Sequence, residues 1–227
     1  MIEELLPGSV AVVEAHGGDA LGDGDPLYPE EEAVIAQAVE KRRREFTAVR
    51  ACARQAMEKL GVPPGPVLPG ERGAPRWPDG LIGSMTHCAG YCAAALVRSG
   101  ELVSLGIDAE PHDQLPEGVL EAVALPTEQT RLRGLAHSHP SVHWDRLLFS
   151  AKESVYKAWF PLTGKWLDFL EADIEIAPGA PTDVAGGFRA QLLVPGPLVQ
   201  GRRIEAFDGR WIVQRGLAAT AVVVPRP

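Results

Sequence analysis

The fold class is decided by residues 81–110, which read LIGSMTHCAGYCAAALVRSGELVSLGIDAE. Two apolar runs in this stretch, Leu81–Thr86 and Tyr91–Arg98, are typical of strands, and Leu102–Glu110 predicts a third. Ser99-Gly100 is a favourable pair for a two-residue hairpin turn, so we expect the third strand to return beside the second. Three successive strands without a helix between them argue against an alternating βαβ chain.

Helices and further strands are predicted on both sides of this stretch. Residues 30–60 contain no Gly or Pro, and an apolar helical face in their later part predicts a helix that ends at Gly61. Helical patterns resume after Pro126, and strand patterns follow Gly164, where Asp208-Gly209 predicts a hairpin. The element order is strand, helix, strands, helix, strands, which predicts an α+β fold with antiparallel sheets.

The same element order predicts two similar halves, residues 1–105 and residues 106–227. A length of 227 residues suits one large domain or two small ones, and it is enough to bury a core without disulfides or a structural metal. A hydrophobic content of 45% with 23% charged residues argues against disorder of the whole chain.

Charge and cysteine content restrict the partners and the compartment. A net charge of −8 argues against a general nucleic-acid binder, so an anionic ligand would need a local basic cluster. Met1–Pro7 is short and acidic, unlike a signal peptide, and no apolar run approaches the ~18 residues of a membrane span. Three cysteines are too few for a disulfide framework. We therefore expect a cytoplasmic protein with neither nucleic-acid nor membrane partners.

Two carboxylates end the third predicted strand. Asp108 and Glu110 share one face of it because strand side chains alternate. Adjacent carboxylates repel unless a cation lies between them, and hard oxygen ligands suit Mg²⁺. Gly106 on that face leaves room for a large group. The alternative is a solvated strand end with two surface acids, which is the commoner situation for such a pair.

The segment Phe149–Trp159, FSAKESVYKAW, predicts a helix with two contact surfaces. An apolar stripe runs along one side, and Glu153 and Lys157 lie almost opposite it. They form an exposed ion pair worth ~0.3–0.5 kcal/mol in the simplest interpretation. However, Phe149 and Tyr156 flank the pair, and a solvated face does not usually carry two aromatic residues. A cleft wall is therefore an equally good interpretation.

Basic residues gather in two places. Arg43, Arg50 and Arg54 are 7 and 4 residues apart, so they follow one strip of the first predicted helix. In an acidic protein this strip is a candidate anion site, although a solvated face paired with nearby glutamates explains it equally well. Arg72 and Arg76 add two cations in a loop rich in Pro and Gly.

His87 follows a predicted strand and precedes a glycine turn. Histidine can bind phosphate or carry protons, although a single histidine is more often structural. No second Cys or His pair has zinc-site spacing near Cys88 and Cys92, so we interpret the cysteines as small buried residues. Carboxylates with Arg, His and Lys together predict phosphoryl-type transfer assisted by Mg²⁺. Walker A, kinase and GxGxxG motifs do not occur in the sequence.

Three ordered motifs carry a resemblance to a known family. They are residues 72–91 (RGAPRWPDGLIGSMTHCAGY), residues 106–110 (GIDAE) and residues 149–163 (FSAKESVYKAWFPLT). In order, spacing and chain length they resemble the 4′-phosphopantetheinyl transferases of the larger, surfactin/enterobactin-synthetase type. The resemblance implies a monomer of two pseudo-two-fold-related halves with coenzyme A in the cleft between them. It implies transfer of phosphopantetheine from coenzyme A to a serine of an apo acyl or peptidyl carrier protein, which leaves adenosine 3′,5′-bisphosphate.

The resemblance also implies roles for single residues. Asp108, Glu110 and Glu153 would hold Mg²⁺ on the pyrophosphate of coenzyme A. Glu153, directly or through water, would take the proton from the attacking serine, and Lys157 would neutralise the pyrophosphate. The full set that the resemblance assigns to coenzyme A is Arg43, Arg50, Arg72, Arg76, Thr86, His87, Asp108, Lys152 and Lys157.

Within that set, Arg50 and His87 would bind the phosphate on the adenosine ribose, and Thr86 would assist by hydrogen bonding. The loop from Arg72 to Arg76 would hold the adenine, although a lysine of some family members is absent there. Two other functions use the same residues. One is a metal-dependent hydrolase of coenzyme A or of a nucleotide pyrophosphate, and the other is a non-catalytic module that binds carrier proteins or coenzyme A.

Overall fold

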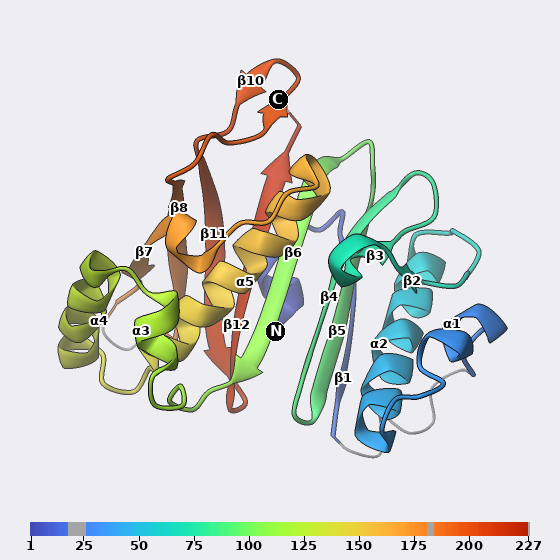
Figure 1. The fold of residues 1–227 in the computed structure, drawn as a ribbon, viewed down its shortest axis with the longest axis horizontal. Coiled ribbons are helices and arrows are strands. Elements are labelled where there is room, and N and C mark those ends of the chain that lie inside the picture. Colours follow the sequence, from blue (N-terminus) through green and yellow to red (C-terminus); the bar gives the residue numbers. More distant parts are fainter. Residues whose placement is uncertain (18–25, 181–183, 227) are drawn as a thin grey trace.

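The computed structural model describes residues 1–17, 26–180 and 184–226. Two antiparallel sheets lie side by side (Figure 1). The first has the strand order β1 (Ala11–His16), β5 (Tyr91–Arg98), β4 (Leu81–Cys88). The second has the order β6 (Leu102–Pro111), β12 (Leu217–Pro225), β11 (Ala206–Gln214), β8 (Ala185–Leu192), β7 (Ala172–Pro178). Two short ribbons complete the strands, β2 (Leu68–Pro69) with β3 (Pro75–Arg76) and β9 (Leu198–Val199) with β10 (Arg202–Arg203). The predicted α+β fold with antiparallel sheets is confirmed.

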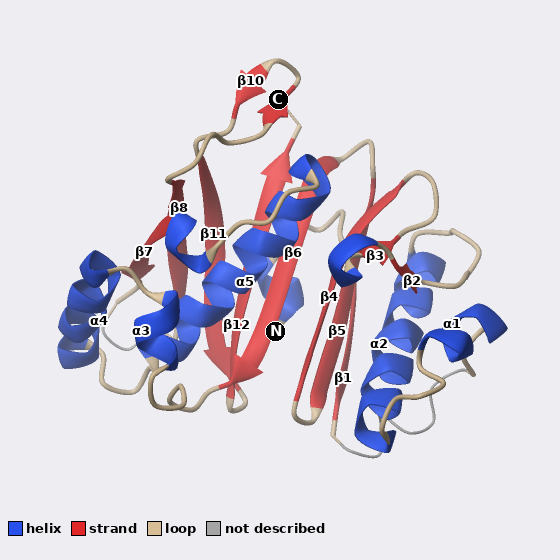
Figure 2. Ribbon diagram, in the orientation of Figure 1, coloured by secondary structure: helices blue, strands red, loops and turns tan. Residues whose placement is uncertain are grey.

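Each sheet carries one long helix (Figure 2). The helices are α1 (Pro29–Val34), α2 (Glu40–Lys59), α3 (Val119–Val123), α4 (Pro126–Ser138) and α5 (Trp144–Thr163). α2 packs on β5 and β1, and α5 packs on β6 and β12. The helix predicted within residues 30–60 is divided into α1 and α2. In the break, Ile35 O accepts from the backbone N–H of Ala38 (2.9 Å) and also from Arg43 Nη1 (2.9 Å).

One apolar core joins the two sheets on the side away from the long helices. The 3₁₀ helix Ile2–Leu5 contributes Ile2 and Leu5 to it, together with buried side chains of β5, β6 and β12. In Figure 1 this N-terminal turn lies behind β12 and β6. The boundary expected between residues 105 and 106 lies inside β6, which pairs with β12 along its length. The division into two pseudo-two-fold-related halves stays a prediction.

Both hairpins predicted from dipeptides are wrong. β6 follows Ser99-Gly100 but pairs with β12 rather than returning along β5, whose neighbours are β1 and β4. Asp208-Gly209 lies inside β11 instead of ending it. A Cβ at Gly209 would lie 2.1 Å from the ring of Phe188 on the neighbouring strand, so this glycine makes room for an aromatic side chain.

Helix α2 and strand β5 bury two of the three cysteines, with 3.6 Å between Cys52 Sγ and Cys92 Sγ. The third, Cys88, is half-buried, and burial raises the pKa of its thiol to about 12. Among the helices of the described residues, none combines the length and the apolar character needed to cross a membrane.

Candidate active site

A cleft of about 750 Å³ lies between α2 with the loop before β4 on one side and α5 on the other. β4 and β6 also contribute to its lining. The predicted site residues that line it are Arg50, Arg72, Thr86, His87, Asp108, Glu110, Glu153 and Lys157. Three other predicted ligand-binding residues, Arg43, Arg76 and Lys152, do not line this cleft. The structure thus brings most of the predicted residues together from distant parts of the chain.

Strands β4 and β6 adjoin through side-chain hydroxyls. Ser84 Oγ accepts from the backbone N–H of Ile107 (3.0 Å), and Thr86 Oγ1 accepts from that of Ala109 (3.1 Å). Residue numbers rise together along the two strands, so they run in the same direction. Their carboxyl ends therefore lie at one end of this seam, with His87 on β4 and Asp108 on β6.

Asp108 is buried and bound on one oxygen only. Its Oδ1 accepts from Lys157 Nζ (2.8 Å) and from the hydroxyl of Thr86 (3.3 Å). Its Oδ2 is buried and has no hydrogen-bond partner within the described structure. A buried carboxylate oxygen without a partner is costly unless something binds it.

Helix α5 lies directly on this part of β6, and Gly106 permits the contact. A Cβ at Gly106 would lie 2.0 Å from Ser154 O and 2.7 Å from Ala158 N. The large group for which Gly106 leaves room is thus the backbone of helix α5. The close approach brings the polar side of α5 to the carboxyl end of β6.

The polar side of α5 is a cleft wall, as its aromatic residues indicated. Phe149, Glu153, Tyr156 and Lys157 all line the cleft, while the apolar stripe of the same helix belongs to the core of the second sheet. Lys157 Nζ also donates to Ile107 O (3.1 Å). Among the described residues, no hydrogen bond or ion pair holds the Glu153 carboxylate.

The charge of Asp108 acts on the other two carboxylates. Burial raises the pKa of the Glu110 carboxyl and the negative charge of Asp108 raises it further, while Arg146 opposes both. Burial also raises the pKa of Glu153, Lys157 lowers it, and Asp108 again raises it. Within the part of the chain that the structure describes, no group of three acidic, His or Cys side chains is already arranged to hold a metal ion.

Of the predicted strip Arg43, Arg50 and Arg54, Arg50 alone lines the cleft, and the neighbouring Arg42 lines it as well. Arg42 Nη1 lies 2.6 Å from His87 Nε2, and because a guanidinium only donates, Nε2 accepts and the ring proton lies on Nδ1. Arg50 is buried, its Nε donates to Val67 O (2.9 Å), and burial lowers its pKa to about 10. Arg43 instead binds the carbonyl of Ile35.

The loop before β4 reaches across to the C-terminal part of the chain. Arg72 has a left-handed backbone (φ 52°), and its guanidinium lies 5.5 Å from the ring centroid of Trp166. Trp166 in turn lies 5.0 Å from the ring of Tyr156 on α5. Arg76, in β3, is exposed and does not line the cleft.

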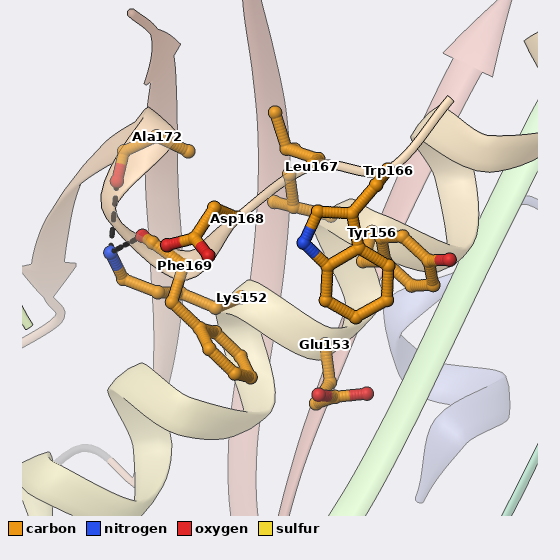
Figure 3. Close-up of a pocket in the computed structure, with 9 residues that line it drawn as sticks. Lys152, Glu153, Tyr156, Trp166, Leu167, Asp168, Phe169 and Ala172 are labelled. Carbon is orange, nitrogen blue, oxygen red and sulfur yellow. Dashed lines mark hydrogen bonds between the residues drawn. The ribbon is translucent and has the colours of Figure 1, made fainter. Parts of the chain in front are cut away.

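A second pocket of about 120 Å³ shares Glu153 and Tyr156 with the cleft, and Trp166 and Phe169 line it on the other side (Figure 3). Lys152 also borders this pocket, but its amine points away into the protein. It forms an ion pair with a carboxylate oxygen of the buried Glu128 (2.9 Å) and donates to the carbonyls of Phe169 (2.5 Å) and Ala172 (2.9 Å). Its placement is that of a structural residue.

Sequence reasoning did not select Arg42 or Arg146. Arg42 lay in the basic run next to Arg43, and only the rotation of α2 decides which of the two reaches the cleft. Arg146 Nη1 binds Glu110 Oε2 (3.1 Å), and no motif pointed to it. Its position seven residues before Glu153, on the same strip of α5, was the available signal.

Comparison with known proteins adds a family to this geometry. The profile of the 4′-phosphopantetheinyl transferase N-terminal domain matches residues 30–97, and that of the 4′-phosphopantetheinyl transferase superfamily matches residues 104–192. The chain is 57% identical over 228 residues to 4′-phosphopantetheinyl transferase Svp of Streptomyces mobaraensis, an alignment that covers 100% of this chain and 90% of that protein.

Two further relatives agree. 4′-Phosphopantetheinyl transferase PptT of Mycobacterium tuberculosis is 50% identical over 86% of this chain and 85% of its own length. 4′-Phosphopantetheinyl transferase Npt of Nocardia iowensis is 48% identical over 98% of this chain and 99% of its own length. These names match the family that the three sequence motifs resemble.

Proposed function

Because this chain belongs to the 4′-phosphopantetheinyl transferase family, we propose that it transfers 4′-phosphopantetheine from coenzyme A to a serine of an apo acyl or peptidyl carrier protein. The observation that carries the proposal is the composition of the cleft. Arg42, Arg50 and His87 on one side and the carboxylates with Lys157 on the other suit a molecule that carries a phosphate and a pyrophosphate.

The carboxylates fit a divalent cation. Asp108 Oδ2 is buried without a partner in the described structure, and the charge of Asp108 raises the pKa of both Glu110 and Glu153. A cation held by these three residues would satisfy the oxygen and relieve the repulsion. Mg²⁺, when bound there, supplies charge neutralisation on the pyrophosphate oxygens.

Glu153 is the residue best suited to accept the proton of the attacking serine. It lines the cleft, no other side chain holds its carboxylate in the described structure, and burial raises its pKa towards that of an effective base. As the proton leaves, the serine oxygen bonds to the phosphorus that carries pantetheine. The bond between this phosphorus and the bridging oxygen breaks, and adenosine 3′,5′-bisphosphate leaves. Lys157 offsets the charge that develops on the leaving phosphate.

The phosphate on the ribose is assigned to Arg42, Arg50 and His87. Arg42 joins the Arg50 and His87 that the resemblance assigns to this phosphate, because Arg42 lines the cleft beside His87. Arg43, which the resemblance assigns to coenzyme A, binds a backbone carbonyl instead. An anion between Arg42 and His87 could accept hydrogen bonds from the guanidinium of Arg42 and from a ring N–H of His87.

The small pocket beside Glu153 suits the pantetheine chain. It has a volume of about 120 Å³, it is lined by Tyr156, Trp166 and Phe169, and it shares Glu153 with the cleft. A chain that leaves the pyrophosphate would therefore pass the base. The division at residues 105/106, the monomeric state and the cytoplasmic location also remain part of this proposal.

The test is incubation of an apo carrier protein with coenzyme A, Mg²⁺ and this protein, followed by mass spectrometry of the carrier. We expect a mass gain of one phosphopantetheine on the serine, its loss with Glu153→Gln, and its retention with the control Glu121→Gln, an exposed residue of α3. Release of free phosphopantetheine without carrier modification would instead support the hydrolase. Binding of coenzyme A without turnover would support the non-catalytic module.

A further inference from the structure

Arg146, in the first turn of α5, binds the end of β6 and the segment that follows it. Arg146 donates from all three of its nitrogens: Nη1 to Glu110 Oε2 (3.1 Å), Nε to Asp113 O (3.0 Å) and Nη2 to Gln114 O (2.9 Å). A planar guanidinium bound on three sides has a fixed orientation. The carboxylate of Glu110 is therefore fixed by a group that cannot itself rotate.

Two residues of α5 fix the two carboxylates of β6. Arg146 and Lys157 lie on the same strip of the helix, and they bind Glu110 and Asp108 respectively. In each case the contact uses one carboxylate oxygen, Oε2 of Glu110 and Oδ1 of Asp108. Each pair thus leaves a second oxygen available in a set orientation. Glu153 lies between them along the helix.

The Arg146–Glu110 ion pair is partly buried. The two side chains are 15% and 21% exposed, so the pair is screened less than one on the open surface. The pair joins the start of α5 to the end of β6. A carboxylate held this way loses less freedom when it takes up a further partner.

We propose that Arg146 is a positioning residue, which orients Glu110 so that its second oxygen is preset for the divalent cation. The inference rests on the proposed function, in which Glu110 is one of the residues that hold Mg²⁺. Residues that orient a metal ligand typically affect metal affinity 10- to 100-fold.

The experiment measures Mn²⁺ binding in place of Mg²⁺, from the free-Mn²⁺ signal in electron paramagnetic resonance, on the full chain with coenzyme A present. We expect Arg146→Met, which keeps the aliphatic packing, to weaken Mn²⁺ binding by about 10-fold. Arg146→Lys keeps the positive charge but loses the planar set of guanidinium donors, and we expect an intermediate affinity for Mn²⁺. In a Glu110→Gln background, Arg146→Met should add little to the loss, because the group that it orients is already replaced.

A neighbouring residue provides the matched control. Asp145 Oδ2 accepts from the backbone N–H of Leu115 (2.8 Å), so Asp145→Ala loosens the same segment without touching Glu110. We expect Asp145→Ala to retain Mn²⁺ affinity. Two results would show that Arg146 has only a structural role. One is an equal loss of Mn²⁺ affinity in Asp145→Ala and Arg146→Met, and the other is a loss of affinity on Arg146→Met that persists in the Glu110→Gln background.

Failure of the inference and failure of the proposed function give different results. If the unmodified protein binds Mn²⁺ and Arg146→Met binds it equally well, the positioning role is refuted and the metal proposal stands. If the unmodified protein binds no Mn²⁺ with coenzyme A present, the metal proposal falls and this inference falls with it. Circular dichroism spectra matching the unmodified protein show that each variant is folded.

Discussion

Gly106→Ala tests whether the contact between β6 and α5 sets the geometry of the cleft. The new Cβ would lie 2.0 Å from Ser154 O and 2.7 Å from Ala158 N, both of which are backbone atoms of α5. Neither can swing aside as a side chain would. Moving the closer pair from 2.0 Å to 3.4 Å, where ordinary contact begins, requires a displacement of about 1.4 Å.

The displacement affects stability and turnover differently. Inserting a methyl group into a packed contact typically costs about 1–3 kcal/mol, which lowers the melting temperature of a protein of this size by roughly 2–12 °C. The helix that moves carries Glu153 and Lys157, so the reacting groups move relative to Asp108. A misplacement of about 1 Å can reduce turnover by about 100-fold, well beyond what the stability loss alone would cause in a protein that stays folded.

The assay compares thermal unfolding with carrier modification per folded molecule. Gly134→Ala is the matched control, because Gly134 lies on the exposed part of α4 and a Cβ there meets nothing within 4 Å. We expect it to stabilise the protein by about 0.5–1 kcal/mol and to leave turnover unchanged. A Gly106→Ala protein with the melting temperature and turnover of the unmodified protein would refute the reasoning.

Three further predictions concern single side chains. Burial raises the pKa of Glu153, so its ionisation disfavours the folded state once pH exceeds the ordinary pKa of a carboxyl group. Glu153→Gln should therefore not lower the melting temperature at pH 7. Turnover should fall at least ~100-fold, and the acid limb of the pH–rate profile should disappear. Arg42→Ala should raise KM for coenzyme A by roughly 10-fold or more with little change in kcat and should have no effect with an analogue lacking the ribose phosphate, whereas the exposed Arg44→Ala should change neither. Lys152→Met should lower the free energy of unfolding by about 3–5 kcal/mol in chemical denaturation, because it leaves Glu128 buried without its cation. A variant that is fully stable but binds coenzyme A weakly would show instead that Lys152 is a ligand-binding residue.

The sequence predicted the fold class and the two elements that meet at the site because their patterns are local. Alternation along β6 places Asp108 and Glu110 on one face, and helical periodicity places Glu153 and Lys157 opposite the apolar stripe of α5. The resemblance to the 4′-phosphopantetheinyl transferases, which the family comparison confirms, joined them into one site. The roles assigned to the single residues stay predictions.

The pairing of strands could not be predicted from local signals. Ser99-Gly100 has the composition of a hairpin turn, yet β6 leaves β5 and pairs with β12, a strand more than one hundred residues later. The strand with which β6 pairs depends on which faces of the two sheets are buried, and the residues around Ser99-Gly100 do not show this. Asp208-Gly209 gave a wrong prediction for another reason, because Gly209 makes room for the ring of Phe188 inside β11 instead of forming a turn.

Charged residues were the hardest to assign because charge alone does not show where a side chain is used. Arg42 and Arg43 are adjacent, but one contacts His87 in the cleft and the other binds a carbonyl at the break before α2. Lys152 and Glu153 are adjacent too, and only Glu153 lines the cleft. In both pairs a helical rotation of about 100° separates a candidate ligand from a structural residue.

A proline followed two residues later by a buried glutamate precedes α2. Pro29 begins a short helix, and Glu31, two residues later, is fully buried. Its carboxylate accepts from the backbone N–H groups of Tyr28 (3.0 Å) and Val67 (2.8 Å) and pairs with Arg54 of α2 (3.2 Å). The same glutamate lies 3.8 Å from Arg50, so it supports the basic side of the cleft from behind.

The pattern occurs again before α5. Pro126 begins a helix, and the buried Glu128 accepts from the backbone N–H groups of Leu125 (2.7 Å) and Ile174 (2.7 Å) and pairs with Lys152 of α5. A buried ion pair contributes little net stability compared with apolar packing, but removing one partner is costly, so such a pair resists any rotation that would separate it. Each long helix that lines the cleft is thus held in rotation by a glutamate two residues after a proline. In this rotation, which the apolar faces of both helices share, Arg42 rather than Arg43 and Glu153 rather than Lys152 line the cleft.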